Sequence, residues 1–112
     1  MKVVTYLINL DGSDQRLASA TAQLQQQNWD FIRFPAYDGR GKELSSFEKY
    51  DDLAAQKILG RSLINSELGC YLSHYGCVKK FLETDADYLL ILEDDIQVLP
   101  EFKQNLDALL NY

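Results

Sequence analysis

The sequence predicts an α/β fold in which a mostly parallel sheet is flanked by helices. Three short, largely apolar runs, at residues 3–8, 31–34 and 87–92, have the length and composition of buried strands. Segments with apolar residues at helical spacing lie between them. Strands that alternate with helices are typical of parallel sheets, and the first strand–helix–strand unit is expected to be right-handed.

The size and composition predict one folded domain spanning residues 1–112. The chain has 112 residues, of which 46% are hydrophobic and 25% charged, the ordinary balance of a globular protein. Its net charge of −6, with no basic patch, argues against nucleic acid as a partner. The longest apolar run, residues 88–92, is too short to cross a bilayer, and the N-terminus lacks signal-peptide features. A cytoplasmic location without a membrane span is therefore expected.

Four helices are expected. The first spans about residues 13–27, and a second, with a weaker pattern, spans 47–59 and is closed by Gly60. The third starts from a cap at Asn65 or Ser66 and reaches about Thr84. Its expected core stripe consists of large apolar residues, namely Leu68, Tyr71, Leu72, Tyr75, Val78 and Leu82. A second stripe of small residues, Gly69, Ser73 and Gly76, is interpreted as a packing surface.

The last helix is expected to hold Pro100 in its first turn. Its apolar face consists of Phe102, Leu106, Leu109 and Leu110. Such a face either folds back onto the sheet or stays exposed and drives association. We predict self-association, with a homodimer as the simplest closed form.

Cys70, His74 and Cys77 share one face of the third helix. The two cysteines are ~10 Å apart along such a helix, beyond the reach of a disulfide, so free thiols are expected. A zinc site is conceivable, but one helix rarely supplies a complete site and the sequence has no second cysteine or histidine cluster. Core packing is therefore favoured for both cysteines, whereas His74 is left open between a core and a site residue.

Carboxylates follow all three predicted strands. Asp11 lies after the first and Asp38 after the second, while Glu93, Asp94 and Asp95 directly follow the third. Because the carboxyl ends of parallel strands meet at one edge of a sheet, these side chains are expected to converge there. Mg²⁺ and Mn²⁺ prefer such oxygen ligands. The simpler alternative for the last three residues is a solvated turn that caps the next helix.

The sign of this charge limits the chemistry. An acidic pocket repels phosphate by itself, but with a divalent cation it becomes a diphosphate site, because the cation bridges the oxygens and neutralises a leaving group. Nucleotide sugars are donors of this kind.

Four sequence blocks together resemble glycosyltransferase family 25, the lipopolysaccharide type. They are YLINLD at 6–11 with Arg16, AYDG at 36–39, ELGCYLSH at 67–74 and LILEDD at 90–95. The resemblance implies a GT-A-like (Rossmann-like) fold and inverting transfer from a UDP-sugar, often UDP-galactose. Bacterial members extend lipooligosaccharide or lipopolysaccharide, and relatives modify collagen hydroxylysine. The implied partners are thus the donor and a saccharide or lipid-linked saccharide acceptor.

The resemblance also assigns site residues. It places Mn²⁺ or Mg²⁺ at Glu93 and Asp95, and the nucleotide sugar at Asn9, Leu10, Asp11, Arg16, Asp38, Gly39, His74 and Asp94. Plainer readings stay open, with Asp11 as a helix cap, Arg16 as a surface charge and residues 38–39 as a turn.

Members of the family usually continue well past the acidic motif, and the later part carries acceptor contacts and the catalytic base. The chain is therefore expected to be the N-terminal part of a GT-A-like transferase, apparently truncated, with the base elsewhere. A catalytically incomplete binding or interaction module is the main alternative. A receiver-like signalling domain is disfavoured. Such domains need a lysine at the end of a late strand, whereas Lys103 is expected to lie in a helix.

Overall fold

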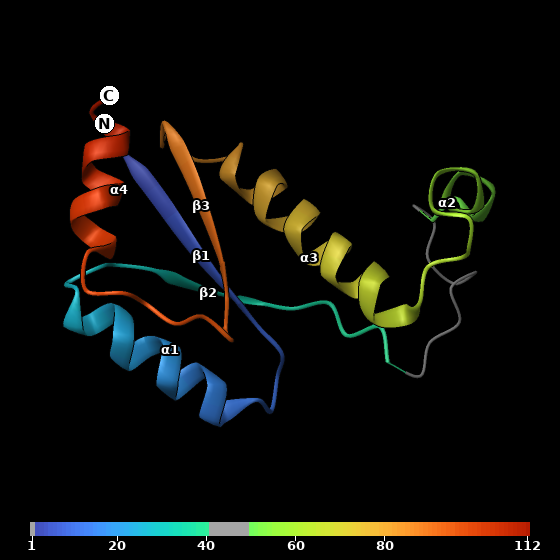
Figure 1. The fold of residues 1–112 in the computed structure, drawn as a ribbon, viewed down its shortest axis with the longest axis horizontal. Helices are drawn as coiled ribbons and strands as arrows, with labels where there is room; N and C mark the ends of the chain where they lie inside the picture. Colours follow the sequence, from blue (N-terminus) through green and yellow to red (C-terminus); the bar gives the residue numbers. More distant parts are fainter. Residues whose placement is uncertain (1, 41–49) are drawn as a thin grey trace.

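The computed structural model describes residues 2–40 and 50–112. Its centre is a three-stranded sheet with the order β2-β1-β3, in which β1 (Val3–Asn9) pairs in parallel with β2 (Ile32–Pro35) and with β3 (Tyr88–Glu93). The register places Ile8 opposite both Phe34 and Glu93, so the three strands finish at the same edge (Figure 1). The predicted α/β class and parallel sheet are confirmed.

Helices cover both faces of this sheet. Their bounds are α1 (Asp14–Gln26), α2 (Asp52–Leu59), α3 (Asn65–Phe81) and α4 (Phe102–Leu110). In Figure 1, α1 and α4 lie on one side of the sheet and α3 on the other, whereas α2 lies beyond the N-terminal end of α3, away from the strands. Gly60 ends α2 in the left-handed conformation, as expected. Residues 47–49 of the second predicted helix lie outside the described part.

The central strand holds the core. Tyr6 and Ile8 of β1 are buried and pack with Cys77 of α3, while Leu7, on the opposite face, is fully buried like Leu24 of α1. This two-faced burial explains why residues 3–8 read as a parallel strand. The interior of β3 is only half-buried, contrary to the expectation of a buried strand, because β3 lies at an edge of the sheet.

The buried face of α3 differs from the predicted one. Only Leu68 and Leu72 of the expected stripe are buried, and its other members are exposed, namely Tyr71, Tyr75, Val78 and Leu82. The helix turns small residues toward the sheet instead: Gly69, Ser73 and Cys77 are buried, and a Cβ at Gly76 would meet the Phe34 ring. Small side chains let the helix axis approach the strands closely, so close approach outweighs the burial of larger side chains. The packing role predicted for the small-residue stripe is confirmed.

The start of α3 also differs from the expectation. The residue that precedes the helix is Ile64, not Asn65 or Ser66, and its backbone N–H donates to Glu67 Oε1 at 3.0 Å. Arg61 holds the same carboxylate with two hydrogen bonds of 2.7 and 2.9 Å. These contacts lower the pKa of Glu67 to about 2, and the hydrogen bonds from the Arg61 guanidinium make the largest contribution. A side chain from within the first turn thus replaces the predicted cap.

The last helix begins later than predicted, because Pro100 precedes it and α4 starts at Phe102. The Phe102 ring makes an edge contact with Trp29, at 5.5 Å between centroids, and Trp29 Nε1 donates to Thr5 Oγ1. This contact anchors α4 near the sheet. Leu109, however, is 70% exposed, so the expected apolar face is only partly covered.

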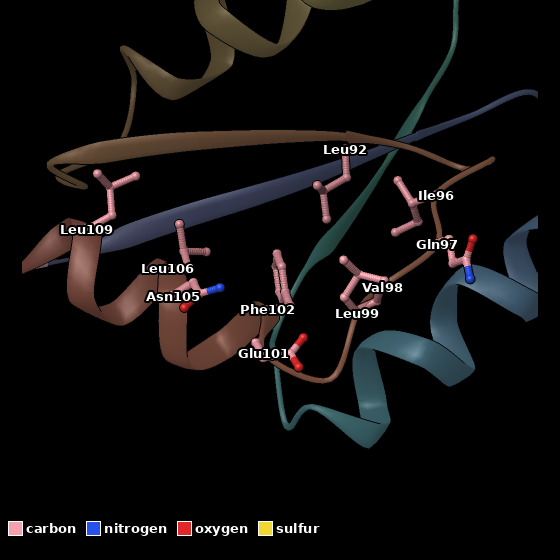
Figure 2. A pocket seen from close by; sticks show the side chains of 10 residues that line it. All are labelled: Leu92, Ile96, Gln97, Val98, Leu99, Glu101, Phe102, Asn105, Leu106 and Leu109. Carbon is pink, nitrogen blue, oxygen red and sulfur yellow. The ribbon is translucent and has the colours of Figure 1, made fainter.

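A hollow of about 450 Å³ remains between α4, the end of β3 and the segment that joins them. Figure 2 shows apolar side chains from these elements pointing into it, among them Leu92, Ile96, Phe102 and Leu106. Self-association through this helix stays a prediction. In the described ranges, no helix combines the length and the apolar character needed to cross a membrane.

Candidate functional site at the carboxyl ends of the strands

A cavity of about 200 Å³ lies where the three strands end. Residues from all three strand ends, from the first turn of α1 and from α3 line it, namely Ile8, Leu10, Arg16, Ala36, Tyr37, Asp38, Gly39, Arg40, Ser66, Cys70, Ser73, Glu93 and Asp94. The predicted convergence of the strand ends is therefore confirmed. It follows from the parallel topology, which sends every strand toward the same edge.

Asn9, the last residue of β1, holds the strand ends together. This residue is only 3% exposed, and its Nδ2 donates to the Ser13 carbonyl at 3.1 Å and to Asp94 Oδ2 at 2.8 Å. Its Oδ1 accepts from Arg33 Nε at 2.9 Å. One amide thus fixes the turn after β1, the acidic end of β3 and an arginine of β2, using donors and an acceptor that only an amide offers together.

Arginines surround the cavity, and sequence reasoning assigned only one of them. Arg16, which the family resemblance assigned to the nucleotide, has its Nη1 3.5 Å from Asp94 Oδ1. Arg33 reaches Asp11 at 2.7 Å, and Arg40 makes paired hydrogen bonds of 3.0 and 2.9 Å to Asp38. The available sequence signal for Arg33 and Arg40 is position, because Arg33 lies near the end of the second predicted strand and Arg40 lies in the loop that follows it.

The lining of the cavity is therefore of mixed charge. Arg16 and Arg40 lie among the lining residues together with the carboxylates of Asp38, Glu93 and Asp94. The carboxylates at the strand ends predicted an acidic pocket that repels phosphate without a cation, with Arg16 as the one arginine assigned to the nucleotide. Guanidinium groups at the same edge reduce that repulsion and can bind phosphate oxygens themselves.

The loop after β2 is pressed against α3. The Tyr37 backbone N–H donates to Ser73 Oγ at 2.9 Å, and Ser73 Oγ donates to the Gly69 carbonyl at 2.8 Å. A Cβ at Gly69 would lie 2.8 Å from the Tyr37 carbonyl oxygen, and one at Gly39 would overlap the Asn65 carbonyl oxygen. The glycines of residues 36–39 and 67–74 therefore serve backbone contact between the loop and the helix.

The three acidic residues after β3 have different surroundings. The side chain of Asp94 is 11% exposed and faces Asn9 and Arg16, whereas that of Glu93 is 51% exposed and faces α3. Asp95 is exposed and does not line the cavity. Asp94 and Asp95 lie in the turn that follows β3, and Asp94 and Glu93 face different neighbours, so the triplet does not form one cluster of carboxylates.

The remaining predicted site residues lie in or beside this cavity. Leu10, Asp38 and Gly39 line it, while Asp11 points outward to Arg33. His74 is 43% exposed, and its Nε2 lies 3.7 Å from Glu93 Oε1, which places it beside the acidic strand end and not in the core. The nucleotide and metal assignments of these residues stay predictions.

The two cysteines differ in their burial. Both are free thiols, as expected. Cys77 is fully buried, and this burial raises its pKa to about 11. Core packing was also expected for Cys70, and that expectation is wrong: Cys70 is exposed, and its Sγ donates to Glu93 Oε1 at 3.4 Å. The partial burial of the thiol, and then this hydrogen bond, raise the pKa of Cys70.

Comparison with known proteins identifies the family of the chain. A family model described as glycosyltransferase family 25 (LPS biosynthesis protein) matches residues 2–112. Glycosyltransferase 25 family members of Aedes aegypti and Drosophila melanogaster are each 32% identical, over 95% of this chain. Human procollagen galactosyltransferase 2 is 26% identical over the same share. The chain spans 18% of the length of each of these relatives. The chain belongs to glycosyltransferase family 25.

Proposed function

We propose that this chain forms the nucleotide-sugar-binding part of a glycosyltransferase and holds the diphosphate of a UDP-sugar where its three strands end. The observation that carries the proposal is one cavity that gathers Asp38, Arg40, Glu93 and Asp94 from the strand ends and Arg16 from the first turn of α1. Guanidinium groups suit the phosphate oxygens, and carboxylates suit a divalent cation. Ligands of open parallel sheets bind at this edge.

We assign the divalent cation, Mn²⁺ or Mg²⁺, to Glu93 and Asp95. Their exposed carboxylates offer the oxygen ligands that these ions prefer, whereas the Asp94 carboxylate is already engaged by Asn9 and Arg16. Asp94 therefore positions the strand end, and its two exposed neighbours offer oxygens to the ion, although Glu93 also accepts a hydrogen bond from Cys70. When bound, the cation would offset the negative charge of the departing diphosphate.

The donor and acceptor follow from the relatives. We take UDP-galactose as the donor, because several relatives are named procollagen galactosyltransferases. For the acceptor we take a lipooligosaccharide or lipopolysaccharide, because the family description names LPS biosynthesis. Inversion at the sugar and a cytoplasmic location belong to the same proposal. A binding module without turnover is the alternative, and galactose transfer by this chain would eliminate it.

Calorimetric titration with UDP tests donor binding. We expect Mn²⁺ to tighten UDP binding by about tenfold or more, because the cation screens the carboxylates from the diphosphate. Asp95→Asn should remove most of this gain. Asp107→Asn, which removes the same charge from exposed α4, should keep it.

Circular dichroism and thermal melting must first show that each variant is folded. Equal UDP affinity in Mn²⁺ and in chelator, measured on the folded wild-type chain, would refute the cation dependence. Loss of the Mn²⁺ effect in Asp107→Asn would show that net charge, and not a site at Asp95, causes it.

A further inference from the structure

Three side chains with different donor atoms meet at the outer side of the candidate site. Cys70 and His74 lie four residues apart, so they project from successive turns of one face of α3, and Glu93 ends β3. Cys70 Sγ is 3.4 Å and His74 Nε2 is 3.7 Å from Glu93 Oε1. One ligand atom of each residue lies within 4.8 Å of the other two.

These separations fit a shared tetrahedral ion. Zinc–sulfur bonds of about 2.3 Å and zinc–nitrogen or zinc–oxygen bonds of about 2.0 Å place sulfur and oxygen about 3.5 Å apart and nitrogen and oxygen about 3.3 Å apart. The two distances to Glu93 Oε1 are already close to these values. Closing the site also requires side-chain rotations that bring Cys70 Sγ and the His74 imidazole nitrogen, which lie within 4.8 Å of each other, to a similar separation.

The donor set differs from that of a magnesium or manganese site. Thiolate and imidazole are softer ligands than carboxylate and favour zinc over Mg²⁺ and Mn²⁺. Two ligands at i and i+4 of a helix, with a third from another element, form a common zinc-binding arrangement. Three protein ligands leave a fourth position for water or a ligand, which is typical of an open zinc site.

The site is also reachable. The His74 and Glu93 side chains are half-exposed, and Cys70 is exposed. Cys77 cannot take part, because it is fully buried in the core against Tyr6 and Ile8. The sequence argued against zinc because one helix does not supply enough ligands. In the structure, the Glu93 carboxylate, which is distant from α3 in the sequence, supplies a further ligand.

We infer that Cys70, His74 and Glu93 bind a zinc-class divalent cation at the edge of the strand-end cavity. Because Glu93 also lines that cavity, bound zinc takes a ligand from the cation that accompanies the nucleotide sugar. Zinc therefore weakens Mn²⁺-dependent UDP binding. This consequence rests on the proposed function, whereas zinc binding itself does not.

Cobalt(II) titration of the whole chain without nucleotide tests the site, since Co²⁺ reports coordination by its absorption. We expect one equivalent to give the intense visible bands of tetrahedral Co²⁺ and a thiolate-to-cobalt charge-transfer band, both displaced by Zn²⁺. Cys70→Ser should abolish the charge-transfer band. His74→Ala and Glu93→Gln should each weaken Zn²⁺ binding about tenfold or more.

Two further variants separate the outcomes. Cys77→Ala should keep the charge-transfer band, because that thiol is not a ligand. Asp95→Asn should keep zinc binding even where it loses the Mn²⁺ effect on UDP, so that this site and the proposed function can fail independently.

Weak octahedral spectra, or a Cys70→Ser variant that binds Zn²⁺ as tightly as the wild type, would overturn the site and leave only a thiol–carboxylate hydrogen bond. Unchanged Mn²⁺-dependent UDP affinity in zinc-saturated protein would overturn the competition.

Discussion

Asn9→Asp is expected to lower the free energy of unfolding by about 2–4 kcal/mol at neutral pH. The substitution keeps the size of the side chain but removes both hydrogen bonds that Nδ2 donates, to the Ser13 carbonyl and to Asp94 Oδ2. It also places a carboxylate against the little-exposed carboxylate of Asp94. Arg33 already contacts Asn9 Oδ1 and offsets only part of this cost.

Urea denaturation of a double-mutant cycle measures the effect. In Asn9→Asp/Asp94→Asn the amide and the carboxylate exchange places, so the contact between them can reform, and we expect about half of the loss to be recovered. An Asn9→Asp loss below about 0.5 kcal/mol, the range of ordinary surface substitutions, would show that the network does not hold the strand ends together.

Gly39→Ala is expected to cost about 2–4 kcal/mol, because the added methyl group would overlap the Asn65 backbone at the start of α3. Backbone on both sides of the contact leaves no flexible side chain to move aside. The loop after β2 would have to separate from α3, which also disturbs the cavity that Gly39 lines. Urea denaturation gives the stability, and UDP titration gives the state of the cavity.

Gly12→Ala is the matched control. Gly12 has a φ of +90°, but a Cβ there meets nothing within 4 Å, so its expected cost is backbone strain alone, about 1–2 kcal/mol. If Gly39→Ala lowers the free energy of unfolding by no more than Gly12→Ala does, close contact between the loop and α3 does not explain why residue 39 is glycine.

The sheet was predictable because its signals are local and strong. Residues 3–8 are a continuous run of β-branched, aromatic and aliphatic side chains, which suits a central parallel strand buried on both faces. Once the strands were assigned, parallel topology placed Asn9, Asp38 and Glu93 at one edge without any knowledge of side-chain positions.

The face of α3 was not predictable from hydrophobicity. Tyr71 and Val78 are larger and more apolar than Gly69 and Ser73, yet the smaller pair is buried. The orientation of α3 depends on the distance between the helix axis and the strands. That distance depends on the contact of α3 with residues 37–39, which are distant in the sequence. A periodicity that weighs only hydrophobicity misses close backbone packing.

The residues of the site were predictable only in part, because some are marked by their position after a strand and others are brought together only by the tertiary structure. The carboxylates were found because they follow strands, but Arg33 and Arg40, which pair with Asp11 and Asp38, were overlooked. The partnership of Cys70 and His74 with Glu93 joins residues about twenty positions apart and depends on how α3 crosses the sheet. Such contacts require the tertiary structure.

The proposed donor site is the mixed-charge cavity of about 200 Å³ at the strand ends, but the described residues also form larger hollows that could hold a ligand. One of these is the apolar hollow beside α4 (Figure 2). Titration of isotope-labelled chain with UDP and Mg²⁺, followed by backbone amide NMR shifts, distinguishes them. Shifts concentrated at residues 9–16, 37–40 and 93–95 are the predicted result. Shifts concentrated at Ile96, Phe102 and Leu106, with the strand ends unperturbed, would contradict the account.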